Sequence, residues 1–260
     1  MDKPWLDQAG VREVARQHQV CPYYLSQELA RWADVVIADY NYYFDLSALL
    51  FGLSQFNQWR VAVLVDEAHN MVERTRQMYS ASLDQQNLNT LRDGAPEALK
   101  KSLQRLNREW NALHKDQVLD YQAYPVTPAR FLQSLNVCVT AIGDYFNEHP
   151  HAVDGALQSF YFEAIQFARI AELFDEHFVF DINKRERGGK RSLSRLSLRN
   201  VVPAGFVRPR LTAACSTVLF SATLNPRRYY ADLLGLPGNT AWVDIESPFS
   251  REQLDVRIIS

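Results

Sequence analysis

The sequence contains few cysteines and no long apolar run, and both absences exclude whole classes of protein. Cys21, Cys138 and Cys215 lie far apart in 260 residues, so we expect a reducing cytoplasm rather than a disulfide framework. No apolar stretch approaches the roughly 18 residues of a membrane span. The first ten residues, MDKPWLDQAG, also lack the apolar core of a signal peptide. We therefore expect a cytoplasmic protein without membrane contact.

A strong net charge is also missing, because the chain carries only about -2. The charge is nevertheless unevenly distributed. From Lys184 to Arg210 there are nine Lys and Arg against one acid, Glu186, which is a local net charge of +8. Phosphate backbones attract such a segment, but Lys and Arg on an edge strand also oppose aggregation. Both interpretations stay open from the residues alone.

Residues 1–79 alternate between helical patterns and short apolar runs, as α/β domains do. We predict helices over residues 11–19, 25–32, 46–53 and 68–78. Between them, Asp34–Ala38 and Val61–Val65 are continuous apolar runs of strand length. Such runs are typical of parallel strands that are covered on both faces, so we predict two buried parallel strands.

The pattern changes near residue 80. Apolar residues spaced three and four apart predict long amphipathic helices over residues 99–113, 132–146 and 153–174, which a small antiparallel bundle would bury. Tyr121–Pro128 is expected to be the loop between the first two. Alternation over residues 178–183, a turn at Gly188-Gly189 and a returning strand over residues 191–199 predict a β-hairpin, with a bulge at Arg195-Leu196.

An α/β pattern returns near the end of the sequence. Ser216–Phe220 predicts a short buried strand, Asn225-Pro226 a helix start, and residues 242–244 and 256–259 further strands. We predict an α/β fold in which one domain, residues 1–79 and 211–260, is interrupted by a mainly helical insertion with a hairpin, residues 80–210.

The stretch VDEAHN, residues 65–70, follows the apolar run Val61–Leu64 and is the strongest functional signal. Asp66 would lie at the carboxyl end of its strand, where open α/β sheets bind ligands. In nucleoside triphosphatases the first carboxylate there holds Mg²⁺ and the second polarises the attacking water. Alternatively, Asp66 and Glu67 only cap the following helix, since acids suit a helix N-terminus.

A phosphate-binding loop, G-x-x-x-x-G-K-[ST], should accompany such a pair, and the sequence lacks one. The only Gly-Lys pair, Gly189-Lys190, is followed by Arg191, and Lys184 stands where the first glycine should be. This pair also lies in a predicted hairpin turn instead of a strand-to-helix loop. The chain therefore has a metal-holding half-site without the loop that binds most of a nucleotide.

Several segments together resemble XPD/DinG-type iron–sulfur DNA helicases of superfamily 2. VDEAHN is similar to their Walker B motif, and residues 21–45, CPYYLSQELARWADVVIADYNYYFD, resemble the segment after their cluster domain. LFSATLNPRRYYADLLG (219–235) is similar to their motif III region, and ESPFSREQLDVRI (246–258) to their passage into the second motor lobe. The resemblance implies a partial RecA-like motor lobe with a parallel sheet, interrupted by an Arch domain.

The resemblance also implies roles for single residues. Asp66 and Glu67 would be the Mg²⁺-holding and water-activating acids, and His69 would link them to motif III. Ser221, Ala222 and Thr223 would couple the nucleotide state to movement of the motor. Alternatively, these residues are only a strand end followed by a helix cap.

Cysteine usage departs from the family. Cys21 would be the last of four ligands of a [4Fe–4S] cluster, and its three partners are absent. We expect Cys138 and Cys215 to be small buried apolar residues. Together with the missing phosphate loop and second motor lobe, this indicates either a fragment of a longer helicase or a truncated relic.

The resemblance implies contact with DNA at two places. The first is the segment after a predicted strand, where aromatic side chains could stack on bases or simply pack in the core: Tyr40, Asn41 and Tyr42. The second is the basic hairpin: Lys184, Arg185, Arg187, Lys190 and Arg191.

The function implied is that of a portion of an ATP-dependent DNA helicase of DNA repair, from a bacterial cytosol or nucleoid. Mg-ATP and [4Fe–4S] would be its cofactors in the complete protein, single-stranded or forked DNA its partner, and a monomer its state. We expect the chain alone to hydrolyse no ATP and to hold no cluster. The alternative is a non-enzymatic module whose Arch binds DNA or another protein.

Overall fold

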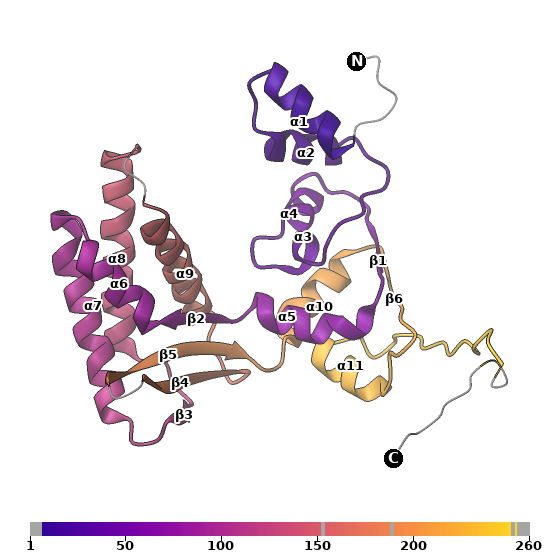
Figure 1. Ribbon diagram of the computed structural model, residues 1–260. Coiled ribbons are helices and arrows are strands. Elements are labelled where there is room, and N and C mark those ends of the chain that lie inside the picture. Colours follow the sequence, from indigo (N-terminus) through magenta and orange to yellow (C-terminus); the bar gives the residue numbers. More distant parts are fainter. Residues whose placement is uncertain (1–6, 152–153, 188–189, 251–252, 254–260) are drawn as a thin grey trace.

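The computed structural model describes residues 7–151, 154–187, 190–250 and 253. Figure 1 shows two groups of helices and strands side by side, with a hydrophobic core in each, and the first two helices of the chain packed on each other outside both cores. The helices are α1 (Gln8–Gln17), α2 (Pro22–Ala30), α3 (Asn41–Phe44), α4 (Leu49–Phe56), the 3-10 turn η1 (Ala68–Asn70), α5 (Met71–Met78), α6 (Gln85–Gly94), α7 (Glu97–Asp116), α8 (Ala129–Glu148), α9 (Gly155–Glu172), α10 (Ala204–Ala213) and α11 (Arg227–Leu234). The strands are β1 (Ala62–Val65), β2 (Ala81–Asp84), β3 (Tyr121–Tyr124), β4 (Phe178–Arg187), β5 (Lys190–Asn200) and β6 (Ser216–Leu219). Among these, no helix combines the length and apolarity needed to cross a bilayer.

The first group is built on a parallel pair of strands, β1 and β6, which lie about 150 residues apart in the sequence. Their register places Val65 opposite Leu219, so the two strands end at the same edge. Helices α3, α4, α5, α10 and α11 supply the rest of the core, in which Met71 and Val207 are fully buried. The predicted α/β fold with a parallel sheet is therefore confirmed.

The strands of this sheet are not buried as predicted. Leu64 is 70% and Val218 50% exposed. Asp34–Ala38 and residues 242–244 form no strand, and Ile37 is 97% exposed. A strand needs a neighbour for its backbone groups, and within the described residues this sheet consists of β1 and β6 alone. Apolar composition without a pairing partner therefore leaves these segments as extended coil.

The second group packs α6 to α9 against one face of a four-stranded antiparallel sheet of order β2-β5-β4-β3 (Figure 1). The three helical patterns predicted from the sequence are α7, α8 and α9. Phe180, Leu196 and Leu83 point from the sheet into this core, where Trp110 is fully buried. Strands β2 and β3 were not predicted, and β3 lies inside the segment expected to be a loop.

The predicted hairpin is formed by β4 and β5. Phe178 pairs with Asn200 and the register runs without a break to Arg185. The irregularity lies between Arg185 and Arg187, so the predicted bulge at Arg195-Leu196 was wrong. The predicted turn at Gly188-Gly189 and the predicted strand over residues 256–259 lie outside the described residues.

The two groups are joined where the chain leaves α5 for β2 and returns from β5 to α10. The Asn200 N–H donates to Ser80 Oγ at 3.0 Å, and Arg76 Nε donates to the Val201 carbonyl at 2.9 Å. Beside them the rings of Tyr79 and Phe206 stack with centroids 4.1 Å apart. The outgoing and returning segments are therefore bonded directly to each other.

Candidate functional site

The VDEAHN loop lies at the carboxyl edge of the parallel sheet, as its sequence predicted. The Phe220 N–H donates to the Val65 carbonyl and the Ala68 N–H donates to the Phe220 carbonyl, both at 3.0 Å. These bonds extend the pairing of β1 and β6 past the ends of both strands. They bring the loop after β1 next to the S-A-T segment after β6, although about 150 residues separate the two in sequence.

Glu67 adopts a left-handed backbone conformation, with φ 48° and ψ 42°. For a residue with a side chain this costs about 1–2 kcal/mol. The Asp66 side chain contributes to the turn, because its Oδ1 accepts a hydrogen bond from the Glu67 N–H at 2.7 Å. The carboxylate of Glu67 is 61% exposed at the sheet edge, and its side chain makes no capping hydrogen bond to the 3-10 turn that follows.

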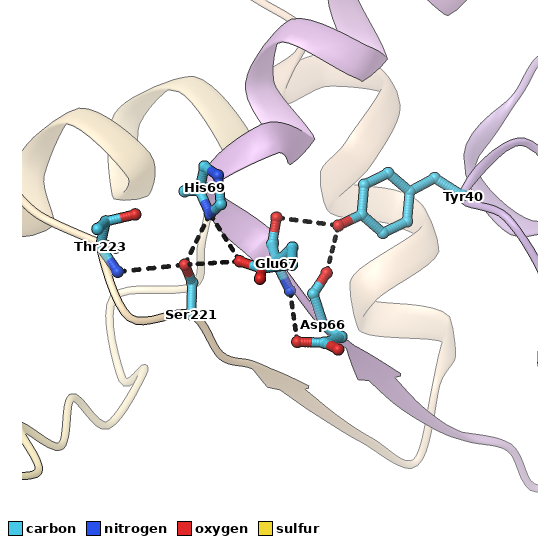
Figure 2. Close-up of polar contacts among 6 residues, drawn as sticks. All are labelled: Tyr40, Asp66, Glu67, His69, Ser221 and Thr223. Atoms are coloured by element: carbon cyan, nitrogen blue, oxygen red, sulfur yellow. Dashed lines mark hydrogen bonds and ion pairs between the residues drawn. The ribbon is translucent and has the colours of Figure 1, made fainter. Parts of the chain in front are cut away.

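His69 joins the two loops (Figure 2). Its Nδ1 lies 2.7 Å from Ser221 Oγ and 3.1 Å from Glu67 Oε2. Ser221 Oγ also accepts from the Thr223 N–H at 3.2 Å and lies 3.5 Å from Glu67 Oε2. The sequence-predicted residues Glu67, His69, Ser221 and Thr223 are thus one polar cluster, whereas Ala222 is exposed and contributes no side-chain bond among those described.

Tyr40 holds the loop from the other side (Figure 2). Its hydroxyl donates to the carbonyl oxygens of Asp66 and, at 3.0 Å, of Glu67. The Arg74 guanidinium lies 5.5 Å from the centre of the Tyr40 ring and pairs with Asp39 at 2.7 Å. Asp39 and Arg74 were missed from the sequence, because 35 residues separate them and neither belongs to a recognisable motif.

The pKa of Tyr40 is raised above its ordinary value. Burial is the main cause, and the carboxylates of Asp66, Glu67 and Asp39 add to it, while the positive charge of Arg74 acts in the opposite direction. The hydroxyl therefore keeps its proton at neutral pH and acts as a donor to the two carbonyl groups.

The neighbours of Tyr40 are placed differently from one another. Asn41 and Tyr42 line a shallow surface hollow together with Tyr23 and Asp45, and Tyr42 is 42% exposed. Tyr43 points into the core, where its hydroxyl donates to the Arg210 carbonyl at 3.3 Å. Of the residues predicted to meet DNA here, Asn41 and Tyr42 lie on the surface, and the Tyr40 hydroxyl is engaged with the VDEAHN loop.

The basic hairpin is partly engaged in contacts of its own. The Lys184 ammonium donates to the Gln117 carbonyl. Arg185 is 57% exposed and lies 3.8 Å from Asp84, which Arg195 also contacts at 3.2 Å. The side chains of the other predicted DNA contacts lie outside the described part of the structure: Arg187, Lys190 and Arg191.

The thiols do not form a cluster site. Cys21 is exposed at the start of α2, and Cys138 is buried between helices as predicted. Cys215 is exposed, so its predicted burial was wrong: it lies in the short connection between α10 and β6 and not within the strand. Within the described residues no group of three or more His, Cys, Asp or Glu could hold a metal. The described residues therefore do not fit a [4Fe–4S] cluster held by this chain alone.

The carboxylates of Asp66 and Glu67 do fit Mg²⁺ as part of a larger site. Mg²⁺ takes one or two protein carboxylates and completes its shell with phosphate oxygens and water. Both side chains are exposed at the sheet edge. Asp66 would be the metal ligand, because the Glu67 carboxylate is already paired with His69.

Comparison with protein families and curated proteins finds relatives for the first third of the chain. The DEAD_2 family model matches residues 2–88. Regulator of telomere elongation helicase 1 homolog from Anopheles gambiae is 40% identical over 81 residues, 31% of this chain and 8% of that protein. ATP-dependent DNA helicase CHL1 from Saccharomyces cerevisiae (strain YJM789) is 34% identical over 88 residues, 34% of this chain and 10% of that protein. The chain thus spans a tenth or less of these relatives.

Solved structures match over most of the chain. One described as XPD_Helicase superposes with a TM-score of 0.59 at 18% identity, covering 87% of this chain and 38% of that one. One described as Truncated XPD gives 0.57 at 19%, covering 90% and 64%. The likeness supports the fold, including the part beyond residue 88. With the sequence relatives, it confirms the resemblance to a portion of an XPD/DinG-type superfamily 2 helicase.

Proposed function

We propose that this portion of an XPD/DinG-type helicase supplies the Mg²⁺-holding and water-activating half of an ATP site that drives movement along single-stranded DNA. The observation that carries the proposal is the bonding of His69 to both Glu67 and Ser221. That contact connects the candidate hydrolytic carboxylate to the loop after β6. The same loops are assigned to hydrolysis and to coupling in the family that the sequence resembles.

Each residue has a defined task in this proposal. Asp66 would hold Mg²⁺, and the bound metal would supply positive charge that neutralises the phosphates. The Glu67 carboxylate accepts a hydrogen bond from the attacking water and orients it. His69 and Ser221 hold that carboxylate in place, 3.1 Å and 3.5 Å from its Oε2. Tyr40 fixes the two backbone carbonyl groups, so the strained turn at Glu67 keeps its shape through the cycle.

The coupling runs through Ser221. A carboxylate that gains or loses its water partner changes its hydrogen bonds to His69 and Ser221. Ser221 Oγ accepts from the Thr223 N–H at 3.2 Å, so such a change reaches the backbone of the loop that leads to α11. This contact is the route by which nucleotide state alters the motor in our proposal.

The chain alone should be inactive. A phosphate-binding loop is absent from its sequence, so binding energy for the nucleotide would have to come from a further segment, as would the four-thiolate cluster. The complete protein is proposed to use Mg-ATP and [4Fe–4S], to act on single-stranded or forked DNA in repair, and to work as a monomer in the cytosol or nucleoid.

The test is DNA-stimulated ATP hydrolysis by a polypeptide that joins this chain to a phosphate-binding loop and a second motor lobe. Glu67→Gln should lower kcat at least 100-fold while nucleotide and DNA binding persist. Glu73→Gln, an exposed acid on α5, is the matched control and should change little. Unchanged turnover in Glu67→Gln would refute the role of Glu67. Hydrolysis by the purified 260-residue chain would refute its inactivity.

A further inference from the structure

The four-stranded sheet has a second face that points away from α6 to α9. Strand alternation defines it, because Phe180, Ile182 and Leu196 enter the helical core and their neighbours point the other way. The side chains that matter below are called the outer sheet face: Asp84, Tyr121, Asp181, Arg185, Arg195 and Arg199.

Charges on the outer sheet face are layered. The carboxylates lie beneath, with Asp181 fully buried and Asp84 23% exposed. The guanidinium groups lie above them, with Arg185 and Arg199 each 57% and Arg195 39% exposed. Three cations stand over two anions, and the anions are the less accessible groups. The more exposed charges of this set are therefore the three guanidinium groups.

An aromatic ring completes the face. Tyr121, on the edge strand β3, is 53% exposed. Tyr121 pairs with Asn183 on β4. Asp181, two residues before Asn183 on the same strand, pairs with Arg199 at 2.5 Å. The pKa of Arg199 is raised, first by its hydrogen bond to Asp181 and also by the nearby charges of Asp181 and Tyr121. The ring of Tyr121 and the guanidinium group of Arg199 thus lie on the same face of the sheet.

We propose that the outer sheet face is a platform for single-stranded DNA, on which one base stacks against Tyr121 while neighbouring phosphates meet Arg185, Arg195 and Arg199. Exposed guanidinium groups attract the phosphate chain, and an exposed ring accepts any unstacked base. A duplex offers no free base face to Tyr121, so a single strand is the better occupant. The proposal rests on the DNA role in the proposed function and adds a contact site away from the ATP loop.

The experiment measures binding of a fluorescein-labelled dT15 to the whole 260-residue chain by anisotropy, at several salt concentrations. Tyr121→Ala should weaken binding about tenfold, which corresponds to about 1.4 kcal/mol. Tyr121→Phe keeps the ring and should stay within about twofold. Phe162→Ala, which removes a 59% exposed ring on α9, is the matched control and should have no effect.

Charge is tested with Arg185→Gln, because Arg195 and Arg199 hydrogen-bond to carboxylates at 3.2 Å and 2.5 Å, whereas Arg185 lies 3.8 Å from Asp84, which keeps Arg195 as its partner. Arg185→Gln should reduce the slope of log affinity against log salt by about 0.7, the value for one phosphate contact on a single strand. Arg108→Gln, a 74% exposed guanidinium on α7, is the control and should leave the slope unchanged. Far-UV circular dichroism checks that each variant is folded.

The outcomes separate this inference from the proposed function. If dT15 binds but Tyr121→Ala and Arg185→Gln behave like their controls, or if dT15 does not bind at all, the platform is refuted. In either case the Glu67→Gln assay still decides the helicase role. Equal displacement of dT15 from the unmodified chain and from Tyr121→Ala by polyglutamate would mean that an acidic protein segment is the occupant, and would also refute the stacking.

Discussion

Replacing Asp181 and replacing Arg199 should destabilise the protein by different amounts, although the two side chains form one ion pair. Asp181 is fully buried, and its Oδ2 accepts from Arg199 Nε at 2.5 Å. Its Oδ1 has no partner among the described residues. Arg199 is 57% exposed, so water already solvates much of its guanidinium group. The carboxylate therefore depends on the guanidinium group far more than the reverse.

The magnitudes follow from this asymmetry. Breaking a fully buried pair by removing one partner costs about 3–5 kcal/mol. Arg199 is half-exposed, so in Arg199→Ala water can enter where the guanidinium group lay and solvate the carboxylate in part. We therefore expect Arg199→Ala to lower the free energy of unfolding by about 2–3 kcal/mol. Asp181→Asn leaves only a solvated guanidinium group and weakens one hydrogen bond, at about 1 kcal/mol. The double variant should also lose about 1 kcal/mol, since it buries no unpaired charge.

The assay is urea unfolding at pH 7, followed by far-UV circular dichroism and by the total tryptophan fluorescence, to which Trp110, fully buried between the helices and the sheet, contributes. Arg199→Ala should be the least stable of the three variants, and adding Asp181→Asn to it should restore stability. The reasoning is refuted if Asp181→Asn is as costly as Arg199→Ala, or if the double variant is no more stable than Arg199→Ala alone.

Three further predictions concern reactivity, backbone strain and pH. Cys138 is buried and its pKa is raised to about 12 by burial, so a thiol reagent at pH 8 should modify Cys21 and Cys215 quickly and Cys138 only after unfolding; three equally fast thiols would contradict this. Gly235 has φ +64° and an added Cβ would lie 3.0 Å from a carbonyl oxygen of α10, so Gly235→Ala should destabilise by about 1–2 kcal/mol in urea unfolding, and a neutral effect would contradict the strain. Burial raises the pKa of Tyr79 from 10.0 to about 12, so between these pH values the folded state keeps a proton that the unfolded state releases. The free energy of unfolding should therefore be unaffected by this group below pH 10 and should fall by about 2–3 kcal/mol as the pH rises from 10 toward 12. Tyr79→Phe should remove that part of the alkaline loss, and identical pH profiles of the two proteins would refute it.

Local periodicity predicted most of the second group. The stripes of α7, α8 and α9 and the alternation of β4 were readable because each repeats over many residues. Strands β2 and β3 were missed because four residues each, ASLD and YQAY, carry little periodic signal. Their strand state comes from partners on β5 and β4 that are about 60 to 115 residues away.

The candidate site was predicted in its parts but not in its surroundings. VDEAHN and the S-A-T segment could be identified as motifs, and their meeting follows from the parallel register of β1 and β6. The support given by Tyr40, Asp39 and Arg74 could not be predicted, since it depends on long-range packing. Strand composition at Asp34–Ala38 was misleading for a related reason: a strand requires a neighbour, and composition does not reveal one.

The direct bonding of the two segments that join the groups has a consequence for the order of folding. About 120 residues lie between Ser80 and Asn200, whose atoms are 3.0 Å apart. If α5 and α10 met first, they would have to close a loop of that length. Once the helical group is folded, the same closure spans only a few residues, which lowers its entropic cost by about 3 kcal/mol. If the second group folds first, it therefore brings the ends of α5 and α10 together as a short connecting turn would.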